Sequence, residues 1–185
     1  MLTLASVLGA AILEWACWPT PGSAAPTPNT LRDLIPASAA KKLGFPSVAK
    51  KPTSSNKTGS KLCSSGSEVV YENTKNFSGL IDEVLSCSTN TAAISLLKQF
   101  ESSYEPSTNV TPPKALGSAA VASEAHPPIY VYYWVSGSYF AFVGIDTDAI
   151  TNRTEYITHE TDPLTPALIH ALDKAATLQS SRLRG

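Results

Sequence analysis

The sequence predicts an α+β protein: a small antiparallel sheet of three or four strands packed against two or three helices, with a disordered N-terminal arm. Three observations lead to this prediction. Residues 129–143, IYVYYWVSGSYFAFV, are the most strand-like stretch, with β-branched and aromatic residues on both sides of a Ser-Gly-Ser segment. Residues 77–104 carry apolar side chains at helical spacing. Residues 25–62 combine five prolines with many Ser, Thr and Lys residues, a composition typical of disorder.

The first elements precede the hairpin. Ser67–Tyr71 predicts a short strand. The next apolar residues predict a helix with Asn76 as its cap, because they follow the helical spacing i, i+3, i+4, i+7 and i+8. These residues are Phe77, Leu80, Ile81, Val84 and Leu85. Asn90 is expected to cap a second helix, which ends before Pro106. The proline-rich stretch 105–128 is expected to be a loop that is either disordered or used for binding.

The remaining elements complete one compact domain over residues 63–185. In the hairpin, Gly137 can take the positive φ that a tight turn needs. Residues 154–160, TEYITHE, predict a third strand. A last helix is expected to begin near Asp162-Pro163 or Thr165-Pro166, because either pair places a capping residue before proline. The predicted order is therefore β-α-α-β-β-β-α.

Residues 1–24 have the pattern of a secretory signal peptide. The uncharged run 2–12 is too short to span a bilayer, and small residues at 22–24 suit a cleavage site after Ala24. The alternative is a buried N-terminal helix, but Pro19 and Pro21 would interrupt it. We therefore expect a secreted, extracellular protein without a stable membrane anchor.

Residues 25–62 form a basic arm ahead of an acidic body. The arm has seven basic residues and one acidic residue, a net charge of +6, whereas the chain from Cys63 onward has a net charge of −6. Two Lys-Lys pairs, which end at Lys42 and Lys51, are candidate processing sites in an exposed chain. The arm is either a pro-segment that is later removed or a solvated linker.

Secretion is compatible with N-glycosylation and with a disulfide. Four Asn-x-Ser/Thr sequons occur; they begin at Asn56, Asn76, Asn109 and Asn152. Asn76 could equally serve as a helix cap. Loss of Cys17 with the signal peptide would leave Cys63 and Cys87 as one pair in an oxidising compartment. The alternative is two buried free thiols.

His159 is the candidate catalytic residue, with Glu160 and Arg153 as neighbours in the sequence. A histidine beside carboxylates can act in general acid–base catalysis. Adjacent residues of a strand point to opposite faces, however, so His159 and Glu160 would address one substrate only if the strand has already ended. The group is also compatible with ordinary surface polarity.

The aromatic residues of the hairpin are candidates for ligand stacking. Tyr130, Tyr132 and Trp134 alternate along one strand and could stack on sugar rings, although such residues more often form a core. The acidic body would repel a phosphate backbone, so no nucleic-acid partner is expected. No metal-ligand spacing, glycine-rich phosphate loop, G-x-S-x-G or H-E-x-x-H motif is present, so we expect neither a metal nor a cofactor.

Together these patterns favour a binding protein over an enzyme. The leading hypothesis is a small secreted protein that binds a protein or carbohydrate partner, in the manner of an effector or a toxin precursor. The alternative is a small secreted hydrolase, similar to a ribonuclease in size and chemistry, that uses His159 and nearby carboxylates.

Overall fold

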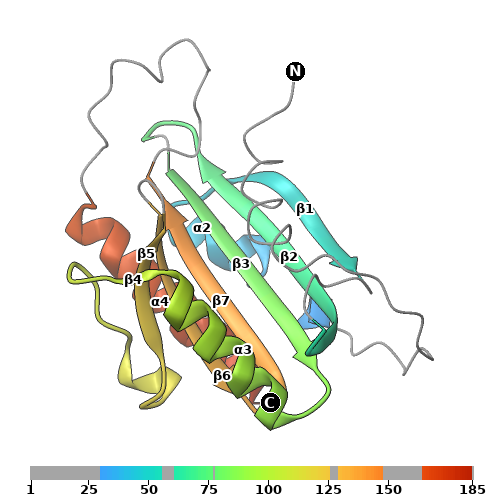
Figure 1. Ribbon diagram of the computed structural model, residues 1–185. Coiled ribbons are helices and arrows are strands. Elements are labelled where there is room, and N and C mark those ends of the chain that lie inside the picture. Colours follow the sequence, from blue (N-terminus) through green and yellow to red (C-terminus); the bar gives the residue numbers. More distant parts are fainter. Residues whose placement is uncertain (1–29, 56–60, 77, 126–128, 148–163, 185) are drawn as a thin grey trace, which may run out of the picture.

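A single seven-stranded sheet forms the centre of the protein (Figure 1). The computed structural model describes residues 30–55, 61–76, 78–125, 129–147 and 164–184. The strand order is β1-β2-β3-β7-β6-β5-β4, and all neighbouring strands are antiparallel. The strands are β1 (Ser47–Ser55), β2 (Cys63–Asn73), β3 (Ser78–Cys87), β4 (Glu105–Pro106), β5 (Val121–Ala125), β6 (Ile129–Ser136) and β7 (Tyr139–Asp146). The α+β class agrees with the prediction, but the predicted sheet of three or four strands is wrong.

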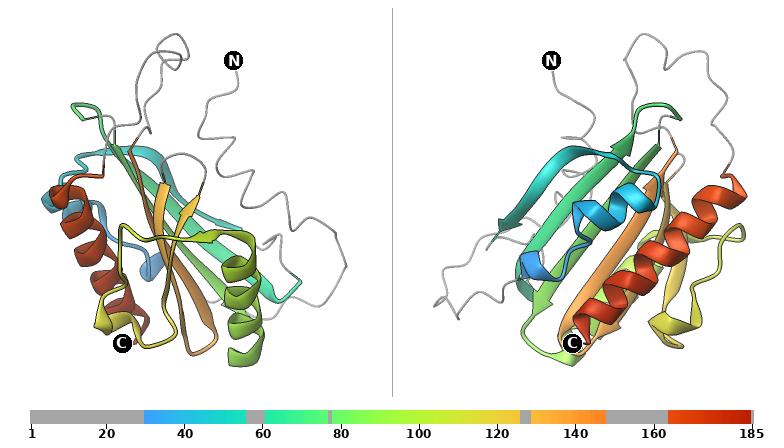
Figure 2. Two further views of the ribbon diagram at one scale, coloured as in Figure 1. Left: turned by 60° about the vertical axis from the view of Figure 1, so that its left-hand side comes forward. Right: turned by 180° about the vertical axis from the view of Figure 1, so that it is seen from behind.

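Helices cover both faces of the sheet, as the two views of Figure 2 show. One face carries α4 (Pro166–Leu183), α2 (Ala37–Lys42) and the short 3-10 turns η1 (Thr30–Arg32) and η2 (Lys114–Leu116). The opposite face carries α3 (Asn90–Ser103). The sheet therefore separates two hydrophobic cores, and its central strands are buried on both sides.

Strand β3 occupies the region that the apolar spacing assigned to the first helix, so that prediction is wrong. Every residue of β3 except Glu83 is buried. Leu80 and Val84 pack in the core under α4, whereas Ile81 and Leu85 pack in the core under α3. A strand buried on both faces needs apolar residues at adjacent positions, and the pairs 80/81 and 84/85 imitate the stripe of a helix.

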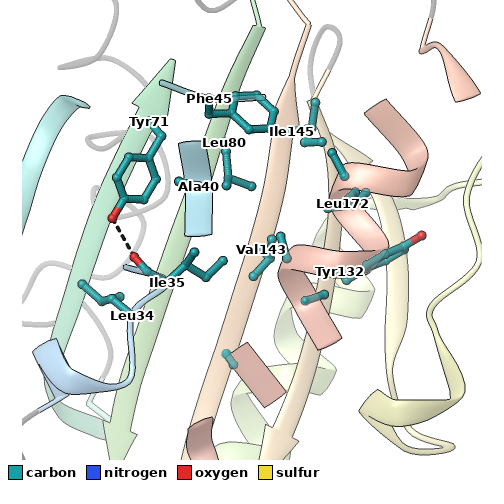
Figure 3. Close-up of a cluster of buried hydrophobic side chains, with 14 of the residues drawn as sticks. Leu34, Ile35, Ala40, Phe45, Tyr71, Leu80, Tyr132, Val143, Ile145 and Leu172 are labelled. Atoms are coloured by element: carbon teal, nitrogen blue, oxygen red, sulfur yellow. Dashed lines mark hydrogen bonds between the residues drawn. The ribbon is translucent and has the colours of Figure 1, made fainter. Parts of the chain in front are cut away.

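Residues 30–55 are folded, which contradicts the predicted disordered arm for this part of the chain. Leu34, Ile35, Ala40 and Phe45 are buried in the α4-side core (Figure 3). The hydroxyl of Tyr71 on β2 donates a hydrogen bond to the Ile35 carbonyl oxygen, at 2.6 Å. Pro36 does not interrupt a helix; it immediately precedes α2, where its missing N–H is no disadvantage.

Strand β1 follows α2 and forms one edge of the sheet. Its pairing with β2 is irregular, with register shifts between Val48 and Lys50 and between Lys50 and Thr53. Pro52 lies within the strand and has no N–H to donate. The prolines and lysines that suggested disorder are thus residues that an edge strand tolerates.

The predicted hairpin is confirmed. Strands β6 and β7 pair from Ile129 with Asp146 to Ser136 with Tyr139, and Gly137 in the turn has φ 59°. The two flanking helices are also confirmed, although the side chain that caps α3 belongs to Thr89 rather than Asn90. The Asn90 side chain instead donates to the Gly137 carbonyl, at 2.6 Å, which joins α3 to the hairpin turn.

Two further predictions need correction or remain open. The loop expected at 105–128 contains β4, η2 and β5, so it extends the sheet beyond the hairpin. The last helix begins at Pro166 with Thr165 as its cap, one of the two predicted starts. The strand predicted at 154–160 lies outside the described residues.

Within the described part of the chain, none of the helices is both long and apolar enough to cross a membrane.

Candidate functional site

The residues proposed for catalysis cannot be placed. His159, Glu160 and Arg153 all lie outside the described residues, as do the sequons at Asn56 and Asn152. The described histidine, His170, is exposed on α4. Among the described residues, no three His, Cys, Asp or Glu side chains are grouped so that they could hold a metal ion. A hydrolase that uses His159 therefore stays a prediction.

The aromatic residues Tyr130, Tyr132 and Trp134 face the α4-side core. Tyr132 and Trp134 are fully buried and Tyr130 is partly buried. The Tyr132 hydroxyl donates to Asp173 Oδ1 on α4, at 2.9 Å. A sugar could stack on Tyr132 or Trp134 only after α4 moved away, so we do not base a site on these residues.

The asparagines of two sequons are described, and both are exposed. Asn76 lies in the turn between β2 and β3 rather than at a helix start, and its Oδ1 accepts a hydrogen bond from the Ser78 hydroxyl. Asn109 is exposed, and its Nδ2 donates to Glu124 Oε1 at 2.7 Å. Glycosylation at either asparagine remains a prediction that the exposed positions permit.

A disulfide joins Cys63 and Cys87, as the cysteine count predicted. The two residues are directly opposite each other at one end of the β2–β3 pair. Both are buried in the α3-side core. A buried disulfide between neighbouring strands fits an extracellular setting.

The candidate processing sites lie in folded chain. Lys42 is the last residue of α2 and Lys51 lies within β1; both side chains are exposed. Cleavage after Lys42 would remove the buried Leu34, Ile35 and Ala40. Removal of this segment as a pro-segment would therefore take part of the hydrophobic core with it.

A cluster of charged side chains lies on the sheet face that α3 leaves uncovered. Of the described helices, only α3 lies on this face, where it packs on β6, β7 and part of β3 (Figure 1). Over β1, β2 and β3 the face carries Lys50, Glu68 and Glu83. Glu68 and Glu83 are directly opposite each other on β2 and β3, and Lys50 on β1 forms an ion pair with Glu68. We call these three residues the Glu68–Glu83 cluster.

The two carboxyl groups of this cluster differ in their electrostatic environment. Cross-strand partners are about 5 Å apart between Cβ atoms, so their like charges repel. Glu68 is compensated by Lys50, whereas Glu83 has no hydrogen-bond or ion-pair partner among the described residues. Burial, and then the nearby Glu68 carboxylate, raise the pKa of Glu83 to about 8, although Lys50 opposes the shift. The Glu83 carboxyl group is therefore harder to ionise than that of an ordinary glutamate.

This arrangement can accept a cation. A positive group placed beside Glu83 would favour the ionised form of its carboxyl group and displace the proton. The Glu68 and Lys50 side chains are 17% and 33% exposed, so a group from outside can reach the cluster. Sequence reasoning missed these residues, because it placed the chain around Glu83 in a helix rather than in a strand paired with β2.

Comparison with known proteins adds no assignment: no protein family, curated protein or solved structure matches this chain. The site and its function must therefore be argued from the residues themselves.

Proposed function

We propose that this protein is secreted and acts outside the cell by binding a protein partner, in the manner of an effector or a toxin precursor. The observation that carries this proposal is the Glu83 carboxyl group. It lies on the sheet face that carries α3, in the part formed by β1, β2 and β3, beside a second carboxylate and, among the described residues, without a counter-ion of its own. A positive group from a partner would supply the counter-ion that the ionised form of this carboxyl group lacks.

The chemistry of the cluster indicates what the partner presents. A lysine or arginine side chain of the partner would form an ion pair with Glu83. Positive and negative groups would then alternate across the cluster, as Lys50 and Glu68 already do. Val70 on β2, which is partly buried beside the cluster, would supply apolar contact next to the charged group.

A basic peptide tests this proposal without knowledge of the natural partner. When hexalysine is titrated into the isotope-labelled full-length protein, we expect amide chemical-shift changes to concentrate at Glu68, Val70 and Glu83. Glu83→Gln should weaken binding several-fold, because the amide cannot ionise. Glu101→Gln, which removes an exposed charge from α3, is the matched control and should leave the affinity unchanged.

Proton release separates this site from general attraction to an acidic surface. Calorimetry in buffers of different ionisation enthalpy at pH 7 should show that the wild-type protein releases a proton on binding and that Glu83→Gln does not. Equal weakening by the two variants, or no proton release from the wild-type protein, would contradict the proposal.

The N-terminus of the exported protein tests the proposed compartment. When the full chain is expressed in a eukaryotic secretory host, we expect the protein in the medium to begin at Ala25, because the signal peptide is cleaved after Ala24. N-terminal sequencing gives the answer directly. Retention in the cell with Met1 intact would refute secretion, and a mature N-terminus at Leu43 would instead support removal of a pro-segment.

A further inference from the structure

Asp82, the neighbour of Glu83 on β3, is fully buried on the opposite face of the sheet. Its two carboxyl oxygens accept hydrogen bonds from different parts of the chain: the Ile35 backbone N–H bonds to Oδ2, and Gln179 Nε2 on α4 bonds to Oδ1. Residues separated by 47 and 97 positions in the sequence thus meet at one side chain. We call Asp82, Ile35 and Gln179 the Asp82 junction.

No basic side chain in the described part of the chain forms an ion pair with Asp82. Arg182 on α4, whose positive charge favours ionised Asp82, instead donates from Nη2 to the Arg32 carbonyl oxygen. Across the sheet, Asp82 is opposite Val69 on β2 and Val143 on β7, which are apolar. A carboxylate in such surroundings is costly, whereas a carboxylic acid is tolerated.

The other groups around Asp82 agree with a protonated acid. Gln179 Oε1 is buried and has no hydrogen-bond partner among the described residues. Turning the Gln179 amide by half a rotation would place this oxygen against Asp82, where it could accept the carboxyl proton. Tyr71 on β2 stays a donor to Ile35, because burial raises the pKa of the Tyr71 hydroxyl to about 12. Burial also raises the pKa of Asp33, against the effect of Arg182 and Arg32.

We propose that the Asp82 junction is a pH-dependent latch: protonated Asp82 holds residues 30–45 and the last turns of α4 on the sheet, and ionisation of Asp82 loosens residues 30–45. The segment is short and lies next to the edge strand: it consists of a 3-10 turn and a six-residue helix that lead into β1. Its other attachment is the burial of Leu34, Ile35, Ala40 and Phe45 in the α4-side core, so its release is a local opening of that core. We call the arrangement with residues 30–45 packed on the sheet the closed state. It is the arrangement expected at acidic pH, where Asp82 is protonated.

The direction of the pH dependence follows from linkage. Burial, opposed by the hydrogen bonds from Ile35 and Gln179, raises the pKa of Asp82 from 3.8 to about 8. An acid whose pKa is higher in the folded state stabilises that state fully below its unfolded pKa. This stabilisation is lost as pH rises toward the folded pKa. The closed state should therefore weaken progressively between pH 4 and pH 8.

Hydrogen exchange of the full chain tests the latch. After correction for intrinsic rates, protection of residues 30–45 should fall by about tenfold per pH unit between pH 5 and pH 8, because one proton is involved. Protection of α3, on the other face, should change much less. In Asp82→Asn, protection of residues 30–45 should depend much less on pH than in the wild-type protein. In Glu83→Gln, which removes the neighbouring titration, it should still fall.

Either of two results would overturn the proposal. The first is an Asp82→Asn protein with the same pH dependence as the wild type. The second is equal loss of protection in α3 and residues 30–45, since that would indicate global unfolding. If Asp82→Asn does not fold, carbon-13 NMR of the wild-type carboxyl groups decides the question. If the titration midpoint of the Asp82 carboxyl group lies near pH 4, the latch is refuted. A titration midpoint well above the ordinary range for aspartate supports it.

Discussion

A chain that begins at Leu43, the product of cleavage after Lys42, is expected to be destabilised by about 5 kcal/mol or to remain unfolded. It lacks the buried side chains of Leu34 and Ile35, and each is worth about 1.5–3 kcal/mol when fully buried. It also lacks the Ile35 groups that bond to Asp82 and Tyr71, so two buried polar side chains lose a partner. Small domains have a total stability of about 5–15 kcal/mol.

Urea unfolding followed by circular dichroism measures this loss. The reference is a chain that begins at Ala25, which retains every described residue. Lys42→Ala in that chain controls for the lost charge, because the Lys42 side chain is exposed, and it should unfold at the reference urea concentration. If the chain from Leu43 also unfolds at that concentration, residues 30–42 contribute nothing to the fold and a removable pro-segment becomes tenable.

Replacement of both cysteines, Cys63→Ala with Cys87→Ala, is expected to lower the free energy of unfolding by about 3 kcal/mol. The disulfide closes a loop with a sequence separation of 24 residues. Without it the unfolded chain gains conformational freedom, while the strand ends lose the bond between opposite residues. Alanine is preferred to serine because both positions are buried.

The measurement is urea unfolding with and without a reducing agent. Reduction should destabilise the wild-type protein by a similar amount and leave the double variant unchanged. If the wild-type protein and the double variant unfold at the same urea concentration, the disulfide does not stabilise this domain, and its role would be sought elsewhere.

Local sequence patterns predicted some elements well. The hairpin was predictable because two runs of strand-forming residues flank a glycine that can take positive φ. Helices α3 and α4 were predictable because each has an apolar stripe and a capping threonine or asparagine nearby. These signals are contained within about 15 residues, so they need no knowledge of tertiary neighbours.

The errors arose where tertiary context decides the structure. Strand β3 is covered on both faces, so its sequence lacks the alternation that identifies a half-buried strand. Residues 30–55 contribute few but well-placed apolar side chains, and composition alone does not show that Leu34, Ile35 and Phe45 share one core. The Glu68–Glu83 cluster depends on the pairing of β2 with β3, so it could not be found once β3 was taken for a helix.

The edge strand β1 has a consequence for the behaviour of the protein at high concentration. Its Lys50 and Lys51 put positive charge on the outermost strand, Pro52 interrupts the row of N–H donors, and the register shifts distort the strand. A strand from another molecule that approaches β1 would be repelled if it is basic and would find no N–H donor at Pro52. The register shifts of β1 would also prevent regular pairing along the strand. The lysines that suggest a cut site in the sequence therefore help to prevent self-association into fibres.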